Sequence, residues 1–217
     1  MPPGSPLPGL DRLIAVCERH AFPMKLTPSL ASQSALQQGA RVLGEPLDPQ
    51  LAAVYQRLGA GEFGLFSLLG PHSEEDGLIP QNQWLKERDQ VQFRSSLVFG
   101  WKPGFAYYYG TVSSLAGTIG LQPVIFIDAM EELFAIPIAS SVDRFFHLYS
   151  RYLEFMVVDP EYVDTGIPDV QFPWDMAPQV VQDEPLIERV RAGQFDFLTG
   201  NYHGALEWLE RLRAPPP

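Results

Sequence analysis

The stretch that decides the fold reads PIASSVDRFFHLYSRYLEFM and spans residues 137–156. A short apolar run leads through two serines into a helical pattern. Ser140 or Ser141 is placed to cap that helix, because a serine side chain can accept a hydrogen bond from the first helical turn. We expect the helix to cover a β-sheet, since its apolar residues form one wide face: Phe145, Leu148, Tyr149, Tyr152, Leu153 and Met156.

Four apolar runs upstream of this helix predict the strands of that sheet. They consist of β-branched and aromatic residues bounded by Gly and Pro, and they cover residues 97–99, 105–112, 124–127 and 133–138. Between the first two runs, Trp101-Lys102-Pro103-Gly104 is typical of a hairpin turn, because Pro fixes one turn dihedral and Gly accepts positive φ. Since the connections are short, we expect a largely antiparallel sheet.

Helix-start signals precede and follow the strands. Thr27-Pro28 and Asp48-Pro49 each place an N-cap residue before a proline at the first helical position. Glycines at positions 59, 61 and 64 predict a tight reversal into a strand over residues 63–69. The predicted helices cover residues 10–20, 27–43, 48–58 and 82–91, followed by a C-terminal pair that starts at Asp183-Glu184-Pro185 and is interrupted at Gly193 and Gly200.

Composition and charge argue against several classes of protein. With 217 residues and 46% apolar content, the chain can bury a core of its own. No stretch approaches the roughly 20 apolar residues that a membrane span requires, and residues 1–6 lack the pattern of a signal peptide. We therefore expect no membrane association and a cytoplasmic location. The single cysteine, Cys17, excludes an intrachain disulfide and a cysteine-cluster zinc site. A formal charge of −11 argues against nucleic-acid binding.

Carboxylates are concentrated in one part of the chain. Residues 152–188 contain nine acidic residues and no Lys or Arg. A surface with this charge attracts a cationic partner, and aromatic side chains among the carboxylates either anchor that partner or pin the loop to its own domain. The alternative is a solvated acidic loop that only promotes solubility. The candidate partner-binding residues are Asp159, Glu161, Asp164, Asp169, Phe172, Trp174 and Asp175.

Motifs for catalysis, metal binding and nucleotide binding are missing or misplaced. Asp143 and His147 lie four residues apart and could form a carboxylate–imidazole pair, but no nucleophile motif accompanies them, which favours a surface pair. The four histidines show no metal-binding spacing. Residues 159–166 lack the spacing of a calcium loop, and the Gly-x-Gly-x-x-Gly match at residues 59–64 follows a helix rather than a strand. We expect no metal, no cofactor and no enzymatic activity.

Three segments resemble the SUKH superfamily. Residues 43–55, LGEPLDPQLAAVY, with the glycine turn at Glu62-Phe63-Gly64, are similar to its helix, Gly-x-x-Leu-Pro-like turn, second helix and Asn-Gly-Gly-type loop. Residues 97–100, LVFG, resemble its strand ending in Phe-Gly, and residues 138–146, IASSVDRFF, resemble its closing helix. The resemblance covers about residues 31–158. The chain departs from the family pattern at Asp48, at Ala60 and in the acidic stretch after Val158.

The resemblance implies an α+β fold with a central, mostly antiparallel β-sheet, helices packed on one side and, in this chain, a C-terminal helical extension. Residues 1–30 would then form an N-terminal helix and extension, and residues 31–158 the core. Residues 159–217 would form an acidic loop and helices packed on that core, within a single globular unit. Bacterial members of the family resemble immunity proteins that bind polymorphic toxins, often nucleases, whereas other members resemble regulators of cell-wall synthesis.

The leading hypothesis is therefore a non-enzymatic immunity protein that neutralises a basic, nuclease-like toxin by stoichiometric binding. The acidity of the chain agrees with it, because nucleases carry basic substrate grooves that an acidic binder can occlude. The alternative is a regulatory or scaffold protein whose partner is another cytosolic protein. An enzyme built around Asp143 and His147 is the third hypothesis.

Overall fold

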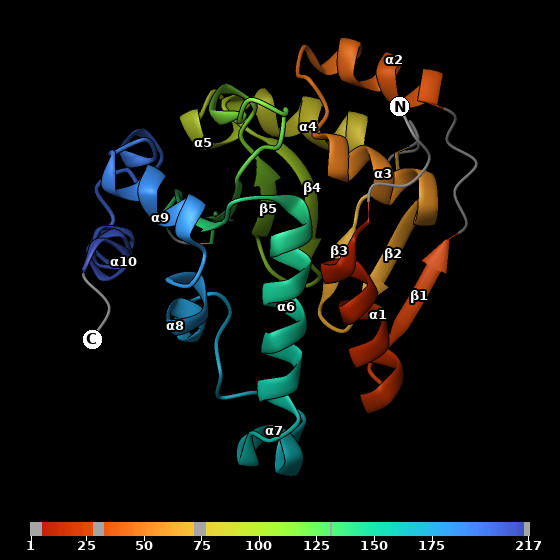
Figure 1. Ribbon diagram of the computed structural model, residues 1–217, viewed down its shortest axis with the longest axis vertical. Coiled ribbons are helices and arrows are strands. Elements are labelled where there is room, and N and C mark those ends of the chain that lie inside the picture. The colour runs from red at the N-terminus through yellow and green to blue at the C-terminus, as the bar shows by residue number, and fades with distance from the viewer. Residues whose placement is uncertain (1–5, 28–32, 72–76, 131, 215–217) are drawn as a thin grey trace.

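The structure confirms an α+β fold built on one antiparallel sheet. It is a computed structural model that describes residues 6–27, 33–71, 77–130 and 132–214 (Figure 1). Within these ranges seven strands follow one another across the sheet in chain order, each antiparallel to the next. The strands are β1 Met24–Thr27, β2 Ala60–Phe63, β3 Phe66–Leu68, β4 Leu97–Lys102, β5 Tyr107–Thr111, β6 Val124–Asp128 and β7 Phe134–Ala139.

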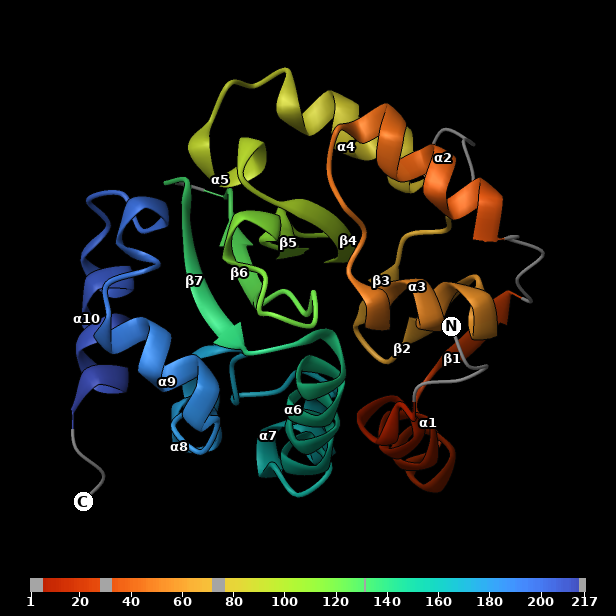
Figure 2. The ribbon, with the colours of Figure 1, turned by 45° about the horizontal axis from the view of Figure 1, so that its top comes forward.

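Helices cover the sheet, and they come from segments before, between and after its strands in the sequence. In both ribbon views α6 lies between α1 and α8, while α4 and α5 lie at the opposite side of the sheet (Figures 1 and 2). Short 3₁₀ turns cover residues 113–115, 174–176 and 196–198. The α-helices of the described ranges are α1 Pro8–His20, α2 Gln33–Leu43, α3 Pro49–Leu58, α4 Leu78–Lys86, α5 Val91–Arg94, α6 Val142–Met156, α7 Pro160–Thr165, α8 Ala177–Val180, α9 Glu184–Arg191 and α10 His203–Arg213.

Asp48 caps α3 as predicted and also ties this helix to the sheet. Its Oδ1 accepts hydrogen bonds from the backbone N–H of Gln50 at 2.8 Å and of Leu51 at 3.0 Å. Its Oδ2 accepts the backbone N–H of Gln122 at 2.7 Å, just before β6. The side chain is fully buried. One carboxylate therefore satisfies two orphan donors at the helix start and a third donor that is distant in the chain.

Four features differ from the sequence prediction. Thr27 ends β1 and does not cap a helix; Pro28 lies outside the described residues, and α2 begins at residue 33. β1 is a strand that the pattern does not predict, because three of its four residues are exposed. The single strand expected over residues 63–69 is a hairpin, with Gly64 at φ 62° between β2 and β3. The helix expected over residues 82–91 is divided into α4 and α5.

α6 covers one face of the sheet with the aromatic face predicted for it. Ser141 is its N-cap, and the Ser141 Oγ accepts a backbone N–H of the first turn at 3.3 Å. Phe145 and Tyr149 pack on Phe66 of β3, with ring centroids 5.4 and 5.6 Å apart, and Tyr109 of β5 lies 5.1 Å from Phe145. All six residues of the predicted face are buried. These rings fill the space between the helix and the sheet, and their burial is a main source of stability.

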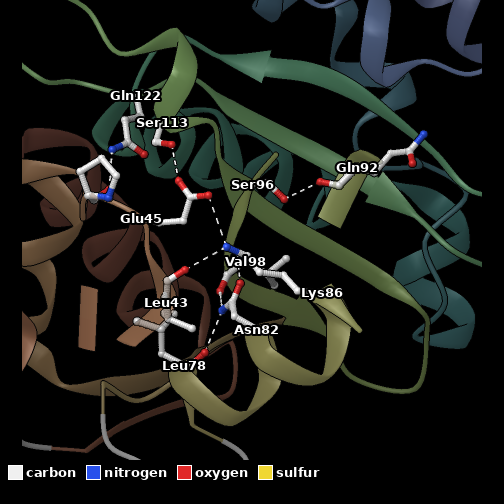
Figure 3. A network of polar contacts seen from close by, with 11 residues as sticks. Leu43, Glu45, Leu78, Asn82, Lys86, Gln92, Ser96, Val98, Ser113 and Gln122 are labelled. Atoms are coloured by element: carbon white, nitrogen blue, oxygen red, sulfur yellow. Dashed lines mark hydrogen bonds and ion pairs between the residues drawn. The ribbon is translucent and has the colours of Figure 1, made fainter. Parts of the chain in front are cut away.

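The opposite face of the sheet is also covered. Tyr109 points to α6, whereas the next residue back, Tyr108, packs against Phe93 of α5 with ring centroids 5.7 Å apart. Asn82 of α4 donates to the Val98 carbonyl at 2.7 Å and accepts the Val98 N–H at 2.8 Å, so its amide takes the place of a neighbouring strand beside β4 (Figure 3). The sequence predicts helices on one side of the sheet, and α1 and α6 lie on that side. On the other side the sheet is covered by α5.

The C-terminal helices form the predicted extension and pack against β7. Trp208 of α10 donates its indole N–H to the Pro137 carbonyl at 3.0 Å. Tyr202 stacks on Phe134 with ring centroids 4.2 Å apart. Gly193 and Gly200, at φ 70° and 61°, lie between α9 and α10 as predicted. In the part of the chain that the structure describes, we find no helix with the length and apolar character needed to cross a membrane.

Replacing Asp48 with alanine should lower the free energy of unfolding by about 2–4 kcal/mol, because three N–H groups, two of them in buried hydrogen bonds, lose their acceptor. Asp48→Asn keeps one side-chain oxygen, which can cap α3 but cannot also bind the Gln122 N–H, and should cost about half as much. Urea unfolding followed by circular dichroism measures both variants. Equal stability of the wild type and Asp48→Ala would contradict this role of the carboxylate.

Candidate functional site

The predicted acidic loop contains a helix, and Asp159 closes the segment onto itself. The Asp159 Oδ1 accepts the backbone N–H of Glu161 at 3.1 Å, at the start of α7. Its Oδ2 accepts the N–H groups of Asp169 at 2.7 Å and of Val170 at 3.3 Å. Asp159 is only 7% exposed. We therefore remove Asp159 from the candidate contact residues, because its oxygens hold the segment in shape.

The two aromatic residues of the candidate site pack into the domain. Phe172 is 9% exposed, and its ring centroid lies 5.3 Å from those of both Tyr149 and Tyr152. Trp174 is half-buried between Phe134 and Trp208, at 5.9 and 5.7 Å. The sequence leaves open whether these aromatic residues anchor a partner or pin the acidic segment to its own domain. The geometry favours the second role.

The other four candidate residues are exposed, and three of them are close in the chain to exposed apolar side chains, whereas Asp175 accepts the backbone N–H of Gln171 and lies outside that group. The exposed carboxylates are Glu161, Asp164, Asp169 and Asp175. Val158, Val163 and Ile167 are 72%, 67% and 69% exposed. In Figure 1 this segment is at the end of the molecule, below α6. We call it the acidic tip and define it as Val158, Glu161, Val163, Asp164, Ile167 and Asp169.

Asp143 joins α6 to α1. Its Oδ1 accepts the N–H groups of Gly9 at 2.9 Å and of Leu10 at 3.2 Å, which are orphan donors at the start of α1. A side chain at position 9 does not fit, because a Cβ there would lie 2.0 Å from the Asp143 carbonyl oxygen. No hydrogen bond of the described residues connects Asp143 with His147. The pair considered from the sequence is thus not a hydrogen-bonded unit.

Beside this helix contact the structure has a second candidate site. It is a cavity of about 290 Å³ between α1, α6 and the end of α8. Three of the α6 residues in its wall, Arg144, His147 and Arg151, are separated by three and four positions, so they share one face of the helix. We call this cavity the arginine pocket, and its lining residues are Arg12, Arg144, His147, Leu148, Arg151, Gln179 and Gln182.

Two carboxylates balance the three guanidinium groups of the pocket only in part. Glu154 accepts hydrogen bonds from Arg12, at 2.7 and 2.9 Å, and from Arg151 at 2.9 Å. The Nε of Arg144 lies 3.8 Å from Asp183, which already accepts a backbone N–H at 2.8 Å. These five groups leave one positive charge in excess, although the whole chain has a formal charge of −11.

The pKa of His147 is sensitive to the positive potential of the pocket. Burial lowers the pKa of His147 below its usual value, and the guanidinium groups of Arg144, Arg12 and Arg151 lower it further. The carboxylate of Asp143 has a smaller, opposite effect on that pKa. The lowered pKa favours the neutral imidazole, in which one ring nitrogen donates a hydrogen bond and the other accepts one.

Part of the pocket has a signal in the sequence. Arg144, His147 and Arg151 recur at helical spacing, opposite the aromatic face of the predicted helix. Arg12 and Gln179 come from distant parts of the chain, and only the fold brings them to α6. Among the residues with a described placement, no group of three or more His, Cys, Asp or Glu is arranged to hold a metal ion.

Comparison with known proteins does not assign this chain to a family or a function. No model of a known protein family matches this sequence, and no curated protein matches it significantly. The functional proposals therefore rest on the residues and on their geometry.

The structure predicts opposite results for two apolar residues of the acidic segment. Phe172→Ala should cost about 3–5 kcal/mol of stability, because the substitution empties a site among packed aromatic rings. Ile167→Ala should change stability by less than about 0.5 kcal/mol, since the side chain is exposed. Urea unfolding of both variants tests the contrast. Similar stability losses would contradict the distinction between a core residue and a tip residue.

The stability contributed by Asp159 should depend on pH. Removal from water raises the pKa of this carboxyl, but hydrogen bonds from the N–H groups of Val170, Asp169 and Glu161 outweigh that effect and lower the pKa overall. A carboxyl with a lowered folded-state pKa adds stability above its unfolded pKa of about 4, and this stability is lost as pH falls through the folded value.

The wild type should therefore exceed Asp159→Asn in stability most clearly at neutral pH, and the difference should shrink as the pH falls below the unfolded-state pKa of about 4. Urea unfolding of both proteins over this pH range measures the difference. A stability difference that stays constant with pH would show that the ionised carboxylate is not what closes the segment.

Proposed function

We propose that this chain is a non-enzymatic protein-binding module that neutralises a basic, nuclease-like toxin by stoichiometric binding at the acidic tip. The observation that carries the proposal is the composition of the tip. Val163 and Ile167 are about two-thirds exposed, and exposed carboxylates lie on the same short segment. Exposed apolar side chains rimmed by polar ones mark contact surfaces, and the carboxylates select a cationic partner.

Two internal contacts support the tip as a preformed surface. Asp159 brackets the segment at both ends through backbone hydrogen bonds. Tyr162, on α7, packs its ring 6.3 Å from that of Phe22, which follows α1. A surface that is fixed before binding loses less conformational entropy when a partner arrives. The tip can thus present its side chains without first folding.

The charge of the surrounding chain supports a basic partner. No Lys or Arg occurs from residue 152 to residue 188, so the tip is not neutralised by its own segment. Long-range attraction of this kind speeds the association of oppositely charged proteins. It also explains why the binding of such a partner should weaken as salt is added.

Membership of the SUKH superfamily and a cytoplasmic place of action are parts of the same proposal. The family motifs lie on the end of α2, the start of α3, β4 and the entry into α6. An immunity protein must meet its toxin inside the cell that it protects, which is why the proposal includes the cytoplasm. A regulatory or scaffold role is the alternative, and the experiment below separates it from immunity.

The test compares the wild type with Glu161→Lys/Asp164→Lys in pull-downs from a lysate of the source cells, washed at low and then at high salt. The control is Glu87→Lys/Glu210→Lys, which changes the charge equally at exposed residues of other elements. We expect the wild type and the control to retain one basic protein at one-to-one stoichiometry. The tip variant should bind that protein about tenfold more weakly or worse.

The retained protein is then purified and assayed for nuclease activity with increasing amounts of the chain. Inhibition that is complete at one equivalent, and that requires the tip, is the expected result. Retention of several cytosolic or cell-wall proteins without nuclease activity would move the assignment to the regulatory alternative. Equal binding by the tip variant and the wild type would exclude the tip as the contact surface.

A further inference from the structure

The arginine pocket has hydrogen-bond donors that the protein does not use. The side chains of Arg12, Arg144 and Arg151 are 36%, 37% and 41% exposed, so their guanidinium groups reach solvent. The side-chain hydrogen bonds of the described residues use Nε and Nη2 of Arg12 and Nη1 of Arg151, and none of them uses the guanidinium group of Arg144. Since each guanidinium carries five N–H donors, most of the donors in the pocket point at no protein acceptor.

The rest of the lining offers contacts for an uncharged part of a ligand. The Oε1 of Gln179 is buried and has no hydrogen-bond partner. Because solvent does not reach this oxygen, a ligand in the cavity would meet the rest of the Gln179 side chain, which lines the wall. Gln182 lines the same cavity, and Leu148 gives the pocket one apolar wall. The pocket therefore joins an anionic subsite to a polar subsite.

The number and arrangement of the arginines favour phosphate over carboxylate. A carboxylate has two oxygens and one charge, and Glu154 shows how Arg12 and Arg151 meet these requirements within the protein. A phosphate monoester has three terminal oxygens and nearly two negative charges, which suits guanidinium groups from two helices. The cavity of about 290 Å³ is near the lower limit of roughly 300 Å³ for small-molecule sites.

We infer that the arginine pocket binds a small phosphomonoester, whose phosphate contacts Arg12, Arg144 and Arg151 and whose hydroxyl groups reach Gln179 and Gln182. His147 lies in the same wall and donates a further hydrogen bond to the phosphate. This inference does not depend on the acidic tip, because none of its residues belongs to the tip. It assigns to the chain a small-molecule ligand in addition to a protein partner.

His147 provides a readout that a loss of folding would not imitate. Its pKa is lowered by burial and by Arg144, Arg12 and Arg151, and is raised slightly by Asp143. Glu154 and Asp183 are the other charged groups paired with these arginines. A bound dianion would offset the guanidinium charges, so the pKa of His147 should rise when the ligand binds.

The experiment titrates the full chain with inorganic phosphate, glycerol 3-phosphate, ribose 5-phosphate, glucose 6-phosphate and acetate at constant ionic strength. Calorimetry measures affinity, and NMR of the histidine ring measures the pKa of His147. We expect at least one ester to bind more tightly than inorganic phosphate, and acetate to bind about tenfold more weakly than phosphate or worse. The pKa of His147 should rise with the ester and not with acetate.

Arg144→Gln and Arg151→Gln should each weaken ester binding about tenfold or more, whereas Arg94→Gln serves as the matched control. Arg94 is 57% exposed and ion-paired, but it lies on α5 outside the pocket. Circular dichroism shows whether each variant folds, and two pocket variants guard against the failure of one. Failure of every ester to bind more tightly than phosphate, an unchanged His147 pKa, or unchanged affinity in both folded pocket variants would overturn the inference.

Discussion

The contact between the starts of α1 and α6 positions both candidate sites. Asp143 accepts two N–H groups at the start of α1, and the missing side chain at Gly9 lets the two backbones touch. This close approach brings the Arg12 Nε to within 3.1 Å of a hydroxyl on α6. It also directs the far end of α1 toward the tip, where Phe22 meets Tyr162. A larger residue at position 9 would force the helices apart, because backbone atoms cannot yield as a flexible side chain can.

The fold could be predicted where burial leaves a clear pattern in the sequence. The strands β4, β6 and β7 are buried on both faces, so they are continuous apolar runs bounded by Gly and Pro, whereas the aromatic face of α6 recurs with the helical period. β1 could not be predicted, because it is a short edge strand whose residues are mostly exposed. The capping role of Asp48 has a local signal, but its bond to Gln122 joins residues far apart in the chain.

The candidate site was predictable in its charge but not in its geometry. Composition alone indicates an acidic surface near α7, and four of the predicted carboxylates are exposed there or close by. The roles of Asp159 and Phe172 depend on what surrounds them, and their surroundings come from other elements. The arginine pocket could be predicted even less well from the sequence. The helical spacing of its α6 residues predicts a basic stripe on that helix. The stripe forms one wall of a pocket only because α1 and α8 pack beside it.

An acidic tip and a basic pocket can operate on one small domain because α6 separates them. His147 is nine residues before Met156 on this helix, about 14 Å along the axis, whereas Arg151 of the same pocket is five residues before it, about 8 Å. The screening length at physiological salt is about 8 Å, so solvent screens the tip from the pocket more completely at His147 than at Arg151. A ligand in the pocket would join α1, α6 and α8 and would stabilise the folded state by mass action. The carboxylates of the tip would keep their attraction for a basic protein, because the pocket contains none of them.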